Sequence, residues 1–388
     1  MTAAGVICEY NPFHSGHLRQ FAQLRERLGA DTAIVCLMSG AFVQRGEVAV
    51  FSPAVRAAAA VECGADIVLE LPVTHSLRSA EGFAAGGVDI LTRLGAVDGF
   101  FFGAEHADEP ELLRTAKILC SAEYEAALRE LLQTRVSYPA ARERALIACG
   151  GDGALLRRPN DILAAEYCKA LVQQKSSLQP LVLPRGGDYH ALDADAENPS
   201  ATAVRALYPD GNWRALVPEA AAALYAGAER FTMAAGERAM LARLRGMARR
   251  DWEVVPYGSE GLWSAVYKAV QRESSVEAVI TAAKSKRYVR TRLQRLLLCA
   301  YLGLTADELA RPAEFVRVLA LSTRGGRLLR RIRETSSVLC LNAGAHAPAG
   351  AQAELETRCA GLSTLFSTGT NAPAAALVQK GRVYHRKI

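Results

Sequence analysis

The chain has 388 residues, of which 50% are hydrophobic and 22% are charged, with a formal net charge of +6. This composition is typical of a folded protein and excludes a mainly disordered chain, while the length predicts two domains because one core rarely grows beyond about 250–300 residues. The sequence has no run of 18 apolar residues and no basic and apolar leader at its start. We therefore expect a cytoplasmic protein without a membrane partner.

The net charge hides a division between the two halves of the chain. Residues 1–212 hold 19 basic and 26 acidic residues, whereas residues 213–388 hold 27 basic and 14 acidic ones. Opposite charges on the two halves predict different partners, with the basic half suited to a polyanion.

The nine cysteines lie far apart, and none belongs to a Cys-x-x-Cys pair. Neither they nor the histidines have the spacing of metal ligands, so we expect reduced thiols and no metal site built by the chain.

Short apolar runs alternate with helical patterns through the first hundred residues. The runs predict buried strands over Ala3–Cys8, Thr32–Met38, Ala65–Leu71 and Val97–Phe102, and the segments between them predict helices over Leu18–Leu28, Pro53–Cys63 and Ala80–Leu94. Continuous rather than alternating apolar runs are typical of parallel strands that are covered on both faces. The pattern predicts an α/β fold with a Rossmann-like, doubly wound parallel sheet.

A mostly helical insertion over about 109–175 precedes a predicted fifth strand at Leu178–Leu183, and beyond residue 213 the patterns become helical. We expect residues 1–212 to form a catalytic domain and residues 213–388 a mainly helical C-terminal domain. The second half has predicted helices over Ala220–Ala228, Glu237–Arg249, Leu262–Arg272, Val276–Ala283, Tyr288–Leu302 and Ala313–Leu321. The pattern leaves Leu362–Ile388 unassigned.

The sequence His14-Ser15-Gly16-His17 follows the first predicted strand and opens the next helix. A helix N-terminus favours an anion, and Gly16 lets the backbone approach a phosphate. Two imidazoles at this point could donate hydrogen bonds to an α-phosphate as its charge develops, so we predict that His14 and His17 are catalytic. The alternative is a pair of ordinary histidines near a helix start.

This motif resembles the H-x-G-H signature of the nucleotidyltransferase superfamily, and the longer run Glu9–His17 resembles the tRNA(Met) cytidine acetate ligases. Further segments are similar to that family in the same order. They are Met38–Glu47, Phe102–Glu105, Arg158–Tyr167, Arg185–His190, Ser200–Arg205 and Lys284–Arg295.

The resemblance implies an ATP site of the HxGH nucleotidyltransferase type. Its predicted residues are Ile7, Cys8, Glu9, Tyr10, Asn11, Pro12, Phe13, His14, Ser15, Gly16, His17, Leu18, Arg19, Gln20, Gly103, Asn160, Arg185, Ser200, Thr202 and Arg205.

Physical chemistry supports several of these assignments and leaves alternatives for others. Gly103 and Arg185 each follow a predicted strand, at the sheet edge where open α/β folds bind ligands, although glycine after a strand is often only a turn. Asn160 could bind adenine or ribose, or could cap a helix. Arg205 is suited to clamp the β- and γ-phosphates, or could lie in a capping turn opened by Ser200.

Six of the twelve residues 284–295 and five of the ten residues 324–333 are Lys or Arg. A cationic helix with an aromatic residue such as Tyr288 could follow an RNA backbone, although a single charge run is usually a solvated helix face. The resemblance implies a tRNA-binding segment. Its predicted residues are Lys284, Lys286, Arg287, Arg290, Arg292 and Arg295.

Three functions fit the sequence. The resemblance implies an ATP-dependent ligase that activates acetate as acetyl-adenylate, releases pyrophosphate, and acetylates the wobble cytidine of elongator tRNA(Met) to N4-acetylcytidine. ATP would be a substrate, accompanied by Mg²⁺. The alternatives are a small-molecule nucleotidyltransferase that makes a dinucleotide cofactor, and a non-catalytic RNA-binding protein. A small-molecule nucleotidyltransferase leaves the basic half unexplained, and a non-catalytic RNA-binding protein leaves the intact His14 and His17 unexplained.

Overall fold

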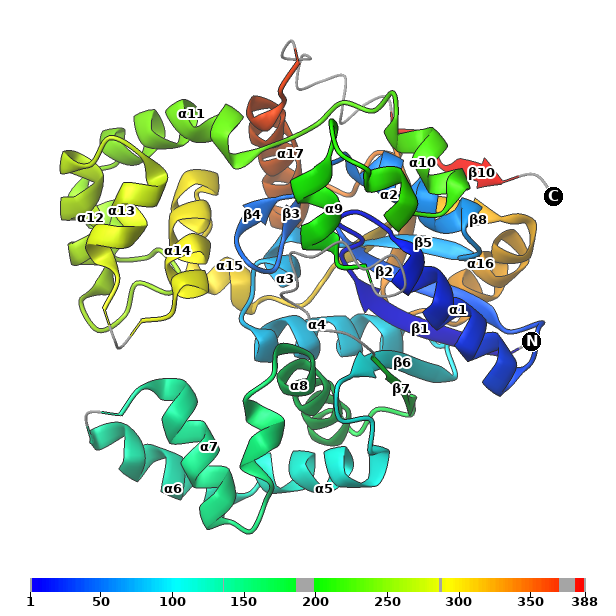
Figure 1. Ribbon diagram of the computed structural model, residues 1–388, viewed down its shortest axis with the longest axis horizontal. Coiled ribbons are helices and arrows are strands. Elements are labelled where there is room, and N and C mark those ends of the chain that lie inside the picture. Colours follow the sequence, from blue (N-terminus) through cyan, green and yellow to red (C-terminus); the bar gives the residue numbers. More distant parts are fainter. Residues whose placement is uncertain (1, 135, 186–198, 286–287, 370–380, 387–388) are drawn as a thin grey trace.

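The computed structural model describes residues 2–134, 136–185, 199–285, 288–369 and 381–386. Within these residues the centre is an eight-stranded sheet in the order β10-β8-β5-β2-β1-β6-β7, with β9 also paired to β8 (Figure 1). The strands are β1 (Ala3–Cys8), β2 (Ala33–Ser39), β3 (Phe42–Val43), β4 (Glu47–Val48), β5 (Ile67–Leu71), β6 (Gly99–Ala104), β7 (Gln179–Pro184), β8 (Phe315–Ser322), β9 (Leu339–Asn342) and β10 (Tyr384–Arg386); β3 and β4 form a separate hairpin.

The five strands β5, β2, β1, β6 and β7 are mutually parallel. They correspond to the five strands predicted from apolar runs, so the predicted parallel sheet is confirmed. Their side chains are buried on both faces: Val35 and Leu37 of β2 belong to one core, and Cys36 and Met38 to the other. Burial on both faces explains why the runs are continuous rather than alternating.

Helices cover both faces of this sheet. Side chains of α4, α5, α8 and α16 build the first core, and those of α1, α2, α9 and α10 build the second. The helices of the first half are α1 (Ser15–Leu28), α2 (Pro53–Glu62), α3 (Val73–Ser76), α4 (Ala80–Arg93), α5 (Glu109–Leu119), α6 (Ala122–Gln133), α7 (Tyr138–Ala148), α8 (Pro159–Gln173) and α9 (Ala201–Leu207).

The second half is mainly helical, as predicted. Figure 1 shows α11 to α14, coloured green to yellow, grouped on one side of the sheet, where they share a third core with Phe42 and Val48 of the β3–β4 hairpin. The helices are α10 (Glu219–Tyr225), α11 (Met233–Gly246), α12 (Leu262–Arg272), α13 (Val276–Ala283), α14 (Arg290–Leu302), α15 (Ala306–Ala310), α16 (Thr323–Thr335) and α17 (Ala351–Ser363).

One predicted helix is wrong. Residues Ala313–Leu321 were expected to be helical, but Phe315–Ser322 forms β8, which pairs antiparallel with β5. A short apolar run fits a buried helix as well as a buried strand, and here the free edge of β5 selects the strand. The final segment, which the sequence left unassigned, contributes β10 at Tyr384–Arg386. Strands from beyond residue 213 therefore complete the sheet, and the division into residues 1–212 and 213–388 stays a prediction.

Candidate active site

Two histidines at the start of α1, the N-cap residue His14 and His17 in the first turn, form the two hydrogen bonds of a capping box. His14 is the N-cap residue, and its Nδ1 accepts a hydrogen bond from the Gly16 amide at 3.1 Å. His17 Nδ1 in turn accepts from the His14 amide at 3.2 Å. The two rings lie 3.8 Å apart between centroids. Because both Nδ1 atoms accept, each neutral ring carries its proton on Nε2.

Both histidines are held in the neutral form. Burial, together with the charges of Arg185, Arg19 and Arg205, lowers the pKa of His14 to about 3. Burial, His14 and Arg185 lower the pKa of His17 well below its usual value. His14 Nε2 is buried without a hydrogen-bond partner among the described residues. A buried N–H donor without a partner costs free energy, so this atom is suited to a ligand acceptor.

A cavity of about 160 Å³ lies beside this pair. It is lined by His14, Gly16, His17, Arg19, Gln20, Gln23, Pro184, Arg185 and Pro199. The polar and cationic side chains favour an anionic ligand, and Gln23 is a lining residue that the sequence prediction missed. Its spacing of three residues from Gln20 on α1 was the available signal, because residues three positions apart share a helix face.

The ends of β6 and β7 and the first turn of α8 bring the predicted residues Gly103, Asn160 and Arg185 together. Arg185 Nη1 donates to Asn160 Oδ1 at 3.1 Å, and Asn160 Nδ2 donates to Glu105 Oε1 at 2.6 Å. A Cβ at position 103 would lie 2.8 Å from Gln20 Nε2, so a glycine here lets the Gln20 side chain approach the strand end.

The predicted residues Ser200, Thr202 and Arg205 lie at α9, which contacts the β1–α1 loop through Arg205. Ser200 Oγ accepts from the Ala203 amide at 3.0 Å, which makes Ser200 the N-cap of α9. Arg205 donates from Nη2 to Thr202 Oγ1 at 3.2 Å and from Nη1 to the Asn11 carbonyl at 2.6 Å. The capping interpretation of this turn is therefore confirmed, and the phosphate clamp stays a prediction. Arg205 lies against the loop that carries His14.

Several of the predicted ATP residues face the protein interior. Cys8 Sγ contacts the Leu37 carbonyl, Tyr10 Oη contacts Cys36 Sγ, and Asn11 Oδ1 accepts from the Val50 amide. Ile7 and Phe13 belong to the two cores of the sheet, whereas Leu18 is 38% exposed.

Arg56 on α2 is a buried residue of this region that the sequence prediction missed. Its guanidinium donates to the carbonyls of Glu9 and Ser39, and also to those of Gly40 and Phe51. It thereby joins the carboxyl ends of β1 and β2, and burial lowers its pKa to about 10. The available signal was that Arg56 is the only charged residue in the apolar segment Pro53–Val61. An arginine in such a segment is buried with its helix and then needs several hydrogen-bond acceptors.

The predicted tRNA-binding residues differ in exposure. Lys284 and Arg290 are exposed, and Arg290 pairs with Glu277. Arg292 is half-buried and donates to the Tyr257 carbonyl at 3.0 Å. Arg295 is 7% exposed and lies 5.0 Å from the Tyr257 ring centroid. Lys286 and Arg287 lie outside the described residues.

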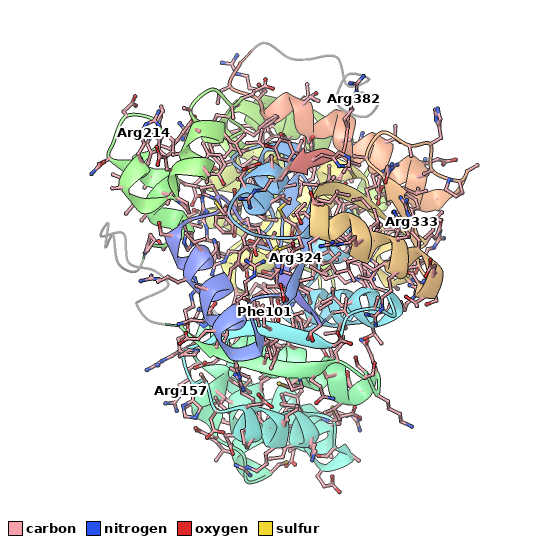
Figure 2. The ribbon with its side chains drawn as sticks, turned by 90° about the vertical axis from the view of Figure 1, so that its right-hand side faces the viewer. Phe101, Arg157, Arg214, Arg324, Arg333 and Arg382 are labelled. Atoms are coloured by element: carbon pink, nitrogen blue, oxygen red, sulfur yellow. The ribbon has the colours of Figure 1, made fainter. Side chains whose placement is uncertain are left out.

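The second basic cluster lies at the opposite edge of the sheet. Arg324 of α16 pairs with Asp66, which directly precedes β5, whereas His14 follows the carboxyl end of the parallel strand β1. Figure 2 shows Arg324 and Arg333 along α16 on the same side of the molecule.

The described residues contain neither a helix that could span a membrane nor a cluster of metal-ligating side chains. No described helix is long and apolar enough to cross a bilayer. The same residues contain no group of three or more His, Cys, Asp or Glu side chains arranged to hold a metal ion.

Residues 1–374 match the family model described as HIGH Nucleotidyl Transferase. The chain is 33% identical over 364 residues to the tRNA(Met) cytidine acetate ligase of Acetivibrio thermocellus, covering 87% of each chain. It is 31% identical over 371 residues to the protein of the same name from Clostridium novyi, covering 87% of this chain and 89% of the relative.

The fold is similar to two crystal structures of Thermotoga maritima TmcAL. The apo form matches with a TM-score of 0.90, and the form bound with alpha-thio ATP matches with a TM-score of 0.89. Both are 26% identical in sequence, and both comparisons cover all of each chain.

Proposed function

Because the chain belongs to the tRNA(Met) cytidine acetate ligase family of HIGH nucleotidyltransferases, we propose that it uses ATP to acetylate the wobble cytidine of elongator tRNA(Met). The product is N4-acetylcytidine. The observation that carries the chemistry is the reciprocally capped His14–His17 pair, which presents the buried, unpartnered His14 Nε2 beside a cationic cavity.

The first step joins acetate to AMP. An acetate oxygen forms a bond to the α-phosphorus of ATP while the bond to the β-phosphate bridging oxygen breaks and pyrophosphate leaves. His14 and His17 donate from Nε2 to the α-phosphate as its negative charge grows. Since both rings are neutral, they act as hydrogen-bond donors rather than as proton sources. Arg185, which lines the cavity, and Arg205, which donates to the Asn11 carbonyl, offset the charge of the phosphates.

The second step transfers the acetyl group. The cytidine N4 atom forms a bond to the acetyl carbonyl carbon, the bond to the phosphate oxygen breaks, and AMP leaves while the amine proton passes to solvent. Acetate is unreactive toward an amine until its oxygen becomes a good leaving group, and the adenylate provides that group. No covalent enzyme intermediate is needed.

Mg²⁺ would accompany the triphosphate, as it does in most nucleotide chemistry. Bound there, it would neutralise phosphate charge and assist the departure of pyrophosphate. The described residues supply cations and hydrogen-bond donors around the cavity, and we assign none of them as a metal ligand.

The basic segment over residues 284–295 is the proposed tRNA contact. Lys284 and Arg290 are exposed and can bind tRNA phosphates, whereas Arg292 is half-buried and contributes less to tRNA binding. We place ATP on residues 1–212 and tRNA on residues 213–388, with the reaction in the cytoplasm where both substrates are found. The positive charge of the second half supports this division.

The test supplies the purified protein with ATP, acetate and tRNA(Met), and in parallel with a tRNA of another anticodon. We expect AMP, pyrophosphate and, by mass spectrometry of digested tRNA(Met), an acetylated cytidine. His14→Ala and His17→Ala should each abolish pyrophosphate release while tRNA binding persists. Unmodified tRNA combined with adenylylation of a pyridine mononucleotide would instead indicate a cofactor-forming nucleotidyltransferase, and tRNA binding without AMP formation would indicate a non-catalytic protein.

A further inference from the structure

The carboxylate of Glu105 holds the first turn of α8. Asn160 Nδ2 donates to Glu105 Oε1 at 2.6 Å, and the Asp161 amide donates to Glu105 Oε2 at 2.9 Å. The N-cap residue of α8, Arg158, makes no side-chain capping hydrogen bond. Glu105 therefore supplies the acceptor that the buried Asp161 amide does not find within the helix.

This contact decides which way the amide of Asn160 points. A carboxylate only accepts hydrogen bonds, so the nitrogen end of the amide must face Glu105. The oxygen end then faces Arg185, whose Nη1 donates to it at 3.1 Å. Asn160 is 8% exposed, so a reversed amide would leave buried polar atoms without suitable partners.

Arg185 lines the same cavity as His14 and His17. We propose that Glu105 is a positioning residue for ATP: through the amide of Asn160 it holds the Arg185 guanidinium where the phosphates bind. This inference rests on the proposed function, which places the triphosphate in that cavity. It also assigns Asn160 a bridging role between two charged side chains.

Single substitutions should break this bridge in defined ways. In Glu105→Gln, the new amide keeps one acceptor oxygen for the Asp161 N–H and turns its NH₂ group toward Asn160. Asn160 must then reverse, and its own NH₂ group meets the Arg185 guanidinium, donor against donor. In Asn160→Asp, two carboxylates face each other at hydrogen-bond distance and repel.

The double variant Glu105→Gln/Asn160→Asp should restore the bridge. The glutamine would accept from the Asp161 amide and donate to the new aspartate, whose second oxygen would accept from Arg185. Every hydrogen bond returns, and the net charge equals that of the wild type. We expect each single variant to raise KM for ATP roughly tenfold or more, and the double variant to lie within about threefold of the wild type.

The experiment measures acetate-dependent ATP–pyrophosphate exchange as a function of ATP concentration, with thermal unfolding of every variant in parallel. This exchange needs no tRNA, so it isolates the adenylation step. Glu130→Gln on α6 is the matched control, because it makes the same chemical change at an exposed position. We expect KM to move more than kcat, which a general loss of folded protein would not produce.

The outcomes separate this inference from the proposed function. A wild-type protein without acetate-dependent exchange overturns the proposed function whatever the variants do. With an active wild type, a wild-type KM in Glu105→Gln overturns the positioning role. A double variant no better than Asn160→Asp alone overturns it too. If Asn160→Asp does not fold, the double variant is compared with Glu105→Gln instead. A KM for ATP closer to the wild type in the double variant supports the positioning role, and an unchanged KM overturns it.

Discussion

The backbone of Arg295 occupies the space in which a side chain at Gly46 would lie. A Cβ at position 46 would be 2.6 Å from the Arg295 amide nitrogen, and Gly46 has φ +82°. Gln294 Nε2 also donates to Glu47 Oε1 at 2.9 Å, so the basic helix α14 packs directly on the β3–β4 hairpin. On its other side the hairpin donates from the Gln44 amide to Glu9 Oε1 at 2.7 Å. The hairpin thus lies between α14 and the histidine loop.

Gly46→Ala should destabilise the protein more than glycine strain alone explains. The alanine would pay roughly 1–2 kcal/mol for the left-handed backbone and a further 1–3 kcal/mol for displacing α14. Gly261→Ala is the matched control, because Gly261 has φ +80° and has no neighbour within 4 Å of a Cβ. Urea unfolding of both variants would measure the difference. Equal losses of unfolding free energy would contradict the packing of α14 on the hairpin.

Arg290 and Arg295 belong to one basic run but should behave differently on substitution. Arg290→Ala removes an exposed charge, so we expect weaker tRNA binding, a salt slope reduced by about one, and little change in stability. Arg295→Ala removes a buried side chain that lies on the Tyr257 ring and donates to the Gln44 carbonyl at 3.4 Å, so we expect a loss of roughly 1–3 kcal/mol in unfolding free energy.

The two measurements are tRNA binding at several salt concentrations and chemical unfolding. Arg327→Ala, on the exposed face of α16 at the opposite edge of the sheet, controls for the general loss of a positive charge. Wild-type stability of Arg295→Ala together with wild-type tRNA affinity of Arg290→Ala would contradict the assignment of Arg295 to packing and of Arg290 to tRNA binding.

Local features of this molecule could be predicted from the sequence. His14 and His17 lie within one turn of a helix whose start is marked by the preceding strand, so their proximity needs no tertiary information. The five parallel strands are likewise visible as apolar runs, since each is buried on both faces.

Features that depend on distant partners could not be predicted in this way. β8 is a strand because it pairs with β5, some 250 positions earlier in the chain, and its residues alone fit a helix equally well. The burial of Arg295 depends on the hairpin and on Tyr257, whereas the charge run by itself indicates only a cationic helix. Glu105 orients Asn160 across 55 residues, so the segment Phe102–Glu105 by itself does not predict that contact.

Arg56→Lys should show that the geometry of this guanidinium, rather than its charge, holds the strand ends. Lysine keeps the positive charge, but one ammonium cannot reach acceptors at Glu9, Ser39 and Phe51 together. We expect a loss of roughly 2–4 kcal/mol in unfolding free energy and slower acetate-dependent pyrophosphate exchange. Arg129→Lys, at an exposed position of α6, is the control. Wild-type stability of Arg56→Lys would mean that the buried charge alone is sufficient.

His14 and His17 should make the protein less stable in mild acid. The folded state lowers the pKa of His14 to about 3, whereas the unfolded chain has the ordinary value of about 6.5. Between these values the unfolded state binds one more proton, so the unfolding free energy rises with pH through this window and is level above it. The slope is at most about 1.4 kcal/mol per pH unit for each histidine.

His14→Asn isolates this contribution, because asparagine is a favoured N-cap residue and does not titrate. Between pH 7 and pH 5 the wild type should lose roughly 1–2 kcal/mol more unfolding free energy than the variant, as measured by urea unfolding at each pH. His75, whose pKa burial also lowers to about 3, contributes to both proteins and cancels in the comparison. Parallel pH profiles would show that His14 is protonated in the folded state, and its Nδ1 could then no longer accept from the Gly16 amide.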